Sequence, residues 1–253
     1  MGYYEEQKEI SYYEVNNRLC LKPASLATLF QDLAIRHSDS LGYTIELLLK
    51  EKRGWIITNW HIDVLRYPKC GEKIKLRTWA SSTKKILAER SYTVLDDGGS
   101  EIIRANSRWV FMDLEKRKPV FVSEEMQKAY ESGLEAAIAG EKYKMPKVSE
   151  GSLISRSTFV VKRSETDTNG HANNVQYIAW AMDCVPDGVY YNGFVSELKV
   201  SYRRECYRGS RVIAKTYKCM DGEDTEIITA FCGADDESVI YSEVVPVWKG
   251  IAQ

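Results

Sequence analysis

The same succession of hydrophobic patterns occurs twice along this chain, and this repetition limits the folds that the chain can adopt. Each copy contains a helical pattern, with apolar side chains every three or four residues, followed by long segments of alternating apolar and polar residues. The region after the second strand pattern aligns between the copies at a constant offset that superimposes Gly71 on Gly209. Any two meanders of long strands share such alternation, but identical element order and a shared glycine favour duplication. Residues 43–53 have no counterpart in the second copy.

Local signals define the expected elements. Proline is favoured in the first turn of a helix, so the first helix is expected to begin at Pro23–Ser25. The turn 96–99, Asp-Asp-Gly-Gly, indicates a hairpin between two strands. A second helix is expected over 174–184. Strands are expected at 8–13, 55–65, 73–81, 86–95 and 102–113 in the first copy, and at 157–163, 194–204, 211–220, 226–234 and 238–248 in the second.

One long helix and one antiparallel sheet per copy define an α+β class. A curved sheet wrapped around a single helix buries the apolar surface of both elements. This arrangement is the hotdog fold, and the repetition predicts a tandem double hotdog. We expect the first hotdog at 1–123, a charged linker with some helix at 124–150, and the second hotdog at 151–253.

The composition excludes several classes of function. The 253 residues carry a net charge of −1, which does not indicate a nucleic-acid binder. The six cysteines form no C-x-x-C pair, so they are expected to be reduced cytosolic thiols rather than disulfides or zinc ligands. No apolar run is long enough to span a membrane, and the first residues do not resemble a targeting signal. We therefore expect a cytoplasmic protein without a metal or other cofactor.

The segment 163–174 has the richest chemistry in the sequence. It places Asp167, Asn169 and His171 between a strand and the start of a helix, where backbone N–H groups favour a developing negative charge. The simpler interpretation is a capping loop, with Asn173 or Asn174 as the helix N-cap.

The histidine count favours a chemical role for this loop. The chain has three histidines: His37 is expected at a polar or packed surface position of the first helix, and His61 is expected to be structural. His171 is therefore the candidate for imidazole chemistry.

A second polar segment follows one strand of the second copy. Glu205 and Cys206 offer a general base and a thiol nucleophile at the end of that strand. Surface charge pairs are the alternative explanation for such a segment. In the first copy, Tyr67 and Pro68 occupy the matching positions, and 18–22 roughly replaces the Asp/Asn/His loop, so the chemistry is expected in one half only.

The segments 167–177, 202–206 and 55–79 together resemble the acyl-[acyl carrier protein] thioesterases of plant plastids and bacteria. The resemblance extends from about residue 9 to residue 248, and the absence of a transit peptide makes the chain similar to a bacterial member. It implies hydrolysis of fatty acyl thioesters on acyl carrier protein (ACP), as part of fatty acid biosynthesis. It also implies catalysis in the second hotdog and an acyl pocket shaped by the first. By the same resemblance, the catalytic residues are Asp167, Asn169, His171, Glu205 and Cys206.

The resemblance leaves the mechanism and the partners open. Cys206 is either the nucleophile or a bystander to water attack assisted by Glu205 and His171, and we favour water attack. The expected partner is ACP with its phosphopantetheine-linked acyl chain, docked on Arg203, Arg204 and Arg208. The alternatives are an acyl-CoA thioesterase on the same fold, a hotdog hydratase or dehydratase, and a lipid-binding module without activity. Chain length, saturation and oligomeric state, including a homodimer, are not determined by the sequence.

Overall fold

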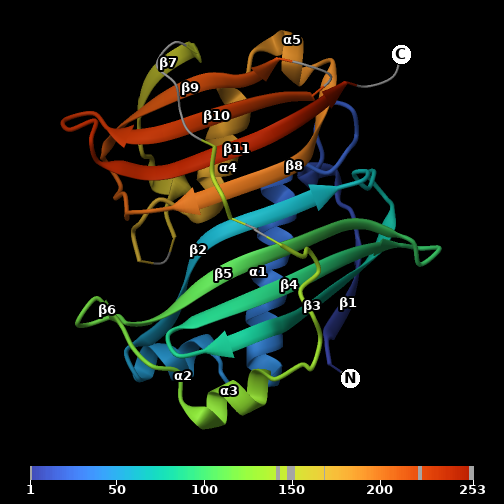
Figure 1. The fold of residues 1–253 in the computed structure, drawn as a ribbon, viewed down its shortest axis with the longest axis vertical. Coiled ribbons are helices and arrows are strands. Elements are labelled where there is room, and N and C mark those ends of the chain that lie inside the picture. Colours follow the sequence, from blue (N-terminus) through green and yellow to red (C-terminus); the bar gives the residue numbers. More distant parts are fainter. Residues whose placement is uncertain (1, 141–142, 147–151, 168, 222–223, 251–253) are drawn as a thin grey trace. The chain divides into compact units, whose positions relative to one another are not determined.

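The structure is a computed structural model that describes residues 2–140, 143–146, 152–167, 169–221 and 224–250. The chain divides into two compact units, Met1–Lys142 and Tyr143–Gln253. Each unit contains one antiparallel sheet and one principal helix, shown in Figure 1.

The sheet of the first unit has the strand order β1-β3-β4-β5-β2, with β6 paired to β5. All of these pairings are antiparallel. The element bounds are β1 Tyr4–Glu9, η1 Tyr12–Glu14, α1 Pro23–Ser40, α2 Ile45–Lys50, β2 Arg53–Val64, β3 Lys73–Lys84, β4 Leu87–Asp96, β5 Glu101–Asp113, β6 Lys118–Pro119 and α3 Glu124–Tyr130.

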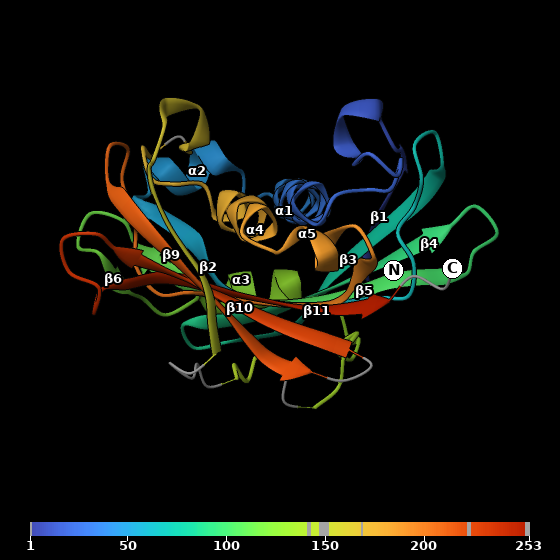
Figure 2. The same ribbon diagram turned by 90° about the horizontal axis from the view of Figure 1, so that it is seen from above.

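Helix α1 lies against the concave face of this sheet, as Figure 2 shows. It begins at Pro23, as expected from the sequence. Phe30 is fully buried, and its ring lies 4.7 Å from that of Tyr92 on β4 and 5.9 Å from that of Trp60 on β2. The apolar stripe of the helix thus fills the curve of the sheet, and the interdigitating rings bring it into contact with several strands.

The surface position expected for His37 is wrong. His37 is 9% exposed, and its Nδ1 lies 2.7 Å from Nη1 of Arg90 on β4. Its ring stacks on Tyr4 of β1 at 5.7 Å. Burial and the Arg90 charge lower the pKa of His37 to about 4, so the imidazole is neutral at pH 7. The polar neighbours of His37 in the helix favoured a surface position. In the structure, side chains from β1 and β4 cover it.

The segment after β6 packs onto the first unit. Met126 and Tyr130 of α3 join a buried cluster with Phe111 of β5. Farther along, Asn106 Nδ2 on β5 donates to the carbonyl oxygen of Ile138 at 2.7 Å. The predicted linker thus begins with a helix that belongs to the first core. Its residues 141–142 and 147–150 lie outside the described residues.

The sheet of the second unit has the order β8-β11-β10-β9-β7, again with antiparallel pairing. Tyr177 and Trp180 of its principal helix pack against Phe231 of the sheet, with ring centroids 5.4 Å and 6.0 Å apart. The predicted double hotdog is confirmed. The element bounds are β7 Leu153–Val160, η3 Arg163–Glu165, α4 Asn174–Asp183, α5 Asp187–Tyr190, β8 Gly193–Tyr202, β9 Arg211–Asp221, β10 Asp224–Gly233 and β11 Ile240–Gly250.

Two predicted strands are misplaced in the same way. The structure ends β1 at Glu9 and β7 at Val160, whereas the sequence patterns extended to residues 13 and 163. A glutamate closes a tight turn after each strand: Glu14 accepts the Ser11 N–H at 2.7 Å, and Glu165 accepts the corresponding N–H of residue 162 at 2.6 Å. The backbone donors therefore bond to a side chain instead of a neighbouring strand. Within the described ranges, no helix has the length and apolar character needed to cross a bilayer.

Candidate active site

The loop before α4 is organised by Asp167. Its Oδ1 accepts the backbone N–H of Asn169 at 2.8 Å and that of His171 at 3.0 Å. The backbone N–H of Asp167 donates to the His171 carbonyl oxygen at 2.8 Å, and Gly170 adopts a φ of +77°, which glycine tolerates without strain. One carboxylate thus determines the path of the loop and the place of the histidine.

The structure brings His171 and Glu205 together. The His171 Nε2 lies 3.7 Å from Glu205 Oε2. The His171 side chain is 24% exposed to solvent, and that of Glu205 is 42% exposed. The backbones meet as well, because the Ala172 N–H donates to the carbonyl oxygen of Cys206 at 2.7 Å. The separation of 3.7 Å exceeds a direct hydrogen bond, and such contacts often tighten only when substrate is bound. An imidazole and a carboxylate therefore share one solvent-accessible site.

Tyr207 is a site residue to which the sequence interpretation gave no role. Its hydroxyl donates to Glu205 Oε2 at 3.0 Å, and its ring meets the His171 ring edge-on at 4.8 Å. An isolated β-bridge pairs it with His171. Its position two residues after Glu205, in the segment that follows β8, is the sequence signal by which it could have been found.

The first turn of α4 is capped by Asn173. Its side-chain oxygen accepts the Val175 N–H at 3.1 Å, which is the capping role considered from the sequence. Asn169 is exposed, and among the described residues its side-chain amide has no hydrogen-bond partner. The Asn169 amide is thus available to a bound molecule, whereas Asn173 is engaged in the helix.

Cys206 follows Glu205 in the chain, but its side chain is buried. It is 2% exposed, and burial raises the pKa of its thiol. Tyr177 lies close enough that its hydroxyl opposes part of this shift. A buried thiol with a raised pKa is mostly protonated at neutral pH, and the thiol is a far weaker nucleophile than the thiolate.

The three predicted docking arginines have different surroundings. Arg203 forms an ion pair with the buried Glu243, so its charge is compensated within the second unit. Arg204 and Arg208 are exposed, and the Arg208 N–H donates to the carbonyl oxygen of Gly170 in the loop before α4 at 3.3 Å. Arg208 is therefore adjacent to the loop that carries His171.

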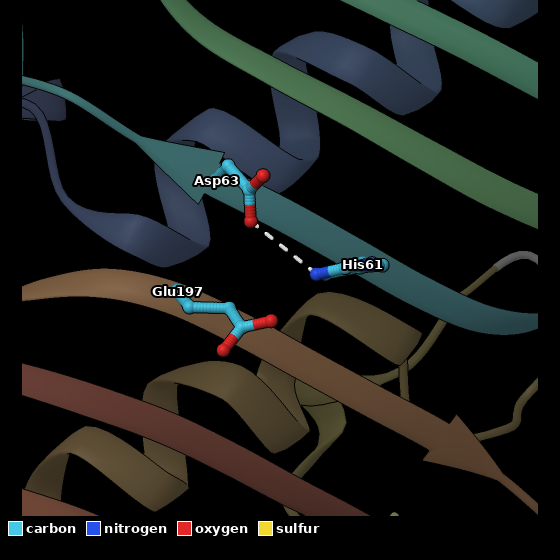
Figure 3. Close-up of side chains that lie close together, drawn as sticks. All are labelled: His61, Asp63 and Glu197. Atoms are coloured by element: carbon cyan, nitrogen blue, oxygen red, sulfur yellow. Dashed lines mark ion pairs between the residues drawn. The ribbon is translucent and has the colours of Figure 1, made fainter. Parts of the chain in front are cut away.

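The remaining histidines belong to the first unit. His61 lies on β2, is 6% exposed, and places Nε2 3.3 Å from Asp63 Oδ1, as Figure 3 shows. Its burial and ion pair are consistent with the structural role expected from the sequence. His37 is buried against Arg90 as described above.

Comparisons with known proteins extend these observations. A family model described as the acyl-ACP thioesterase N-terminal domain matches residues 2–130, and one described as the C-terminal domain matches residues 149–248. A chloroplastic oleoyl-acyl carrier protein thioesterase of Coriandrum sativum is 28% identical over 95% of this chain and 69% of its own length. An oleoyl-acyl carrier protein thioesterase of Arabidopsis thaliana is 26% identical over 84% of this chain and 63% of its own length. This chain thus spans about two thirds of these relatives.

Solved structures show the same fold. An acyl-ACP thioesterase from Bacteroides thetaiotaomicron superimposes with a TM-score of 0.86 at 22% identity, covering 98% of each chain. A 12:0-ACP thioesterase from Umbellularia californica superimposes with a TM-score of 0.85 at 21% identity, covering 99% of this chain and 98% of its own.

Proposed function

Because this chain belongs to the acyl-ACP thioesterase family, we propose that it hydrolyses fatty acyl thioesters on ACP, releasing a free fatty acid and ending chain elongation. The observation that carries the proposal is the 3.7 Å approach of His171 to Glu205 in an accessible loop that Asp167 holds in place. A helix cap alone requires no carboxylate at 205, so the capping interpretation does not explain this pair.

The proposed reaction is attack by water on the thioester carbonyl. Glu205, directly or through His171, accepts the proton of the attacking water. The resulting oxyanion is stabilised by N–H donors beside the first turn of α4. The carbon–sulfur bond then breaks, and the pantetheine sulfur receives the proton held by the enzyme. The products are a fatty acid and the free thiol of ACP.

Three side chains support this core reaction in the proposal. Asn169 positions the thioester or the attacking water, and Asp167 holds the loop. Cys206 contributes to packing, since its buried thiol is disfavoured as a nucleophile.

The proposal assigns the acyl chain to the first unit and the thioester to the second. Each buried methylene contributes about 0.8 kcal/mol, so the length of an apolar pocket can select the acyl chain. We assign the enzyme to the cytoplasm and expect it to assemble as a homodimer. We assign the docking of ACP to a basic surface that includes Arg204 and Arg208. The exposure of both arginines supports that assignment.

The test is thiol release from matched substrates. The same acyl chain is presented on ACP and on CoA, and the liberated thiol is followed with a chromogenic disulfide. We expect the greater kcat/KM on ACP, and we expect His171→Ala and Glu205→Gln each to lower kcat by about 10²–10⁴-fold. Asp63→Asn, in the other unit, serves as a control for loss of a carboxylate.

The alternatives give different outcomes in the same assay. A greater kcat/KM on CoA identifies the acyl-CoA enzyme. Hydration of an enoyl thioester without thiol release identifies a hydratase. No reaction with any of these thioesters identifies a binding module and contradicts the proposal.

A further inference from the structure

The first unit contains a loop before α1 whose backbone hydrogen bonds resemble those of the loop before α4, which carries Asp167 and His171 and which we call the active loop. We call residues 11–22 the sister loop. Asn16 Oδ1 accepts the backbone N–H groups of Arg18 at 2.9 Å and Cys20 at 3.2 Å, the pattern that Asp167 forms in the second unit. Leu19 has a φ of +58° at the position of the positive-φ glycine. The chain thus builds the same turn twice, before α1 and before α4.

Isolated bridges to the segment between two later strands establish which residues correspond. Cys20 pairs with Lys69 as His171 pairs with Tyr207. The next residue of each loop then donates its N–H to the carbonyl oxygen of the residue before that partner, at 2.9 Å in the first unit and 2.7 Å in the second. The two backbones therefore match at the described loop positions that form these bonds and at the segment beside them.

The side chains at these matched positions differ in charge. At six matched positions, the side chains of the second unit include two carboxylates and no lysine or arginine, whereas those of the first unit include three cations and no carboxylate. These sister positions therefore lack the acid–base groups and carry more positive charge than their counterparts. The replacements are Asn16 for Asp167, Arg18 for Asn169, Cys20 for His171, Lys22 for Asn173, Tyr67 for Glu205 and Lys69 for Tyr207. The sister loop also contains Glu14, whose carboxylate pairs with Lys8.

Large aromatic side chains are exposed on the sister loop. Tyr12 is 80% exposed and Tyr13 is 88% exposed. The Lys22 ammonium lies 5.0 Å from the centre of the Tyr13 ring and donates to the Tyr13 carbonyl oxygen at 2.8 Å. Among the described residues, neither Lys22 nor Lys69 forms an ion pair with a carboxylate. Exposed tyrosines are enriched at protein-binding surfaces, and basic side chains beside them attract an acidic partner.

We propose that the sister loop, with Lys69 beside it, contacts the acidic surface of the carrier protein in addition to the contact assigned to Arg204 and Arg208. The inference rests on the proposed function, because it names the surface that recognises the macromolecular part of the substrate. ACP is acidic, so its charge complements that of the loop. A second copy of this chain is a poorer occupant, because a two-fold contact would place the same cations against one another.

The experiment compares a carrier-bound substrate with a small neutral one. Lys22→Glu and Lys69→Glu are combined, and kcat/KM is measured on acyl-ACP and on the N-acetylcysteamine thioester of the same acyl chain. We expect a fall of about tenfold or more on acyl-ACP and a change below about twofold on the small thioester. Tyr12→Ala alone is expected to lower kcat/KM on acyl-ACP by about fivefold.

The matched control reverses two exposed lysines elsewhere in the first unit, Lys50 on α2 and Lys128 on α3. Lys50→Glu with Lys128→Glu makes the same change in net charge and is expected to leave both substrates within about twofold. Equal loss on acyl-ACP in the control overturns the docking site, because the effect then follows net charge alone.

Other outcomes separate the two proposals. Unchanged activity of Lys22→Glu/Lys69→Glu on acyl-ACP overturns the docking site while leaving hydrolysis intact. Equal loss on both substrates overturns the docking site in favour of a structural role for these lysines. Dissociation of an oligomer, seen by light scattering, overturns it in favour of a contact between copies of the chain. Failure of the wild-type protein to hydrolyse either thioester overturns the proposed function itself.

Discussion

Asp167 shows how one side chain can organise a functional loop. Its carboxylate bonds two backbone N–H groups, and Asn16 forms the same two bonds in the first unit with a neutral amide. Substitutions at position 167 can therefore separate the effect of the two hydrogen bonds on activity from the effect of the negative charge.

We predict that Asp167→Asn retains at least tenfold more activity than Asp167→Ala. The amide oxygen of asparagine can accept both N–H groups, whereas alanine leaves them without this partner. We expect Asp167→Ala to lose about 10²–10⁴-fold in kcat, measured by thiol release from acyl-ACP. Equal losses in the two variants would mean that the charge itself is needed.

Cys206 is the residue at which the two proposed mechanisms diverge. We predict that Cys206→Ala keeps at least about a third of kcat, because a buried thiol with a raised pKa is a poor nucleophile. Removing the sulfur leaves a small cavity, so Cys206→Ser is tested beside it, together with urea unfolding of both variants. An inactive but folded Cys206→Ala, with an acyl-enzyme trapped by mass spectrometry in the wild type, would contradict water attack.

At the scale of elements, the contact of α1 with β4 carries a titratable group. The pKa of His37 is about 4 in the folded protein, below the ordinary 6.5. Between these values the unfolded chain binds more protons, so the free energy of unfolding rises with pH. The contribution of His37 is complete above about pH 6.5 and is lost as the pH falls toward 4.

We predict that this histidine lowers the free energy of unfolding by about 2 kcal/mol between pH 7 and pH 5. His37→Gln keeps an acceptor for the Arg90 guanidinium but does not titrate, so its stability should change less over the same range. Urea unfolding of both full-length proteins at each pH gives the comparison. Parallel pH profiles would show that His37 does not become buried and neutral on folding.

At the scale of the whole molecule, recognition of an acidic carrier is an electrostatic process. We predict that raising salt from about 0.05 M to about 0.3 M lowers kcat/KM on acyl-ACP several-fold more than on the N-acetylcysteamine thioester. Screening weakens attraction between charged surfaces but has little effect on a small neutral substrate. The same salt sensitivity for both would place the effect on the enzyme rather than on docking.

The two principal helices, the duplication and the polar loop around His171 were predictable from the sequence alone. These properties depend on local patterns: the apolar period of α1 and α4, the proline at position 23, and the polar run around His171. The shared Gly71 and Gly209 both adopt positive φ, which explains why the alignment at that point was informative.

Which distant groups meet depended on the fold of the complete chain. It placed Glu205 and Tyr207 beside His171, covered His37 with the first sheet, and showed that the sister loop copies the active loop. Patterns of apolar residues report which face of an element is buried, but they contain no information on the register between a loop and a strand far along the chain. That register depends on how each sheet curves around its helix, and packing of the complete core determines it.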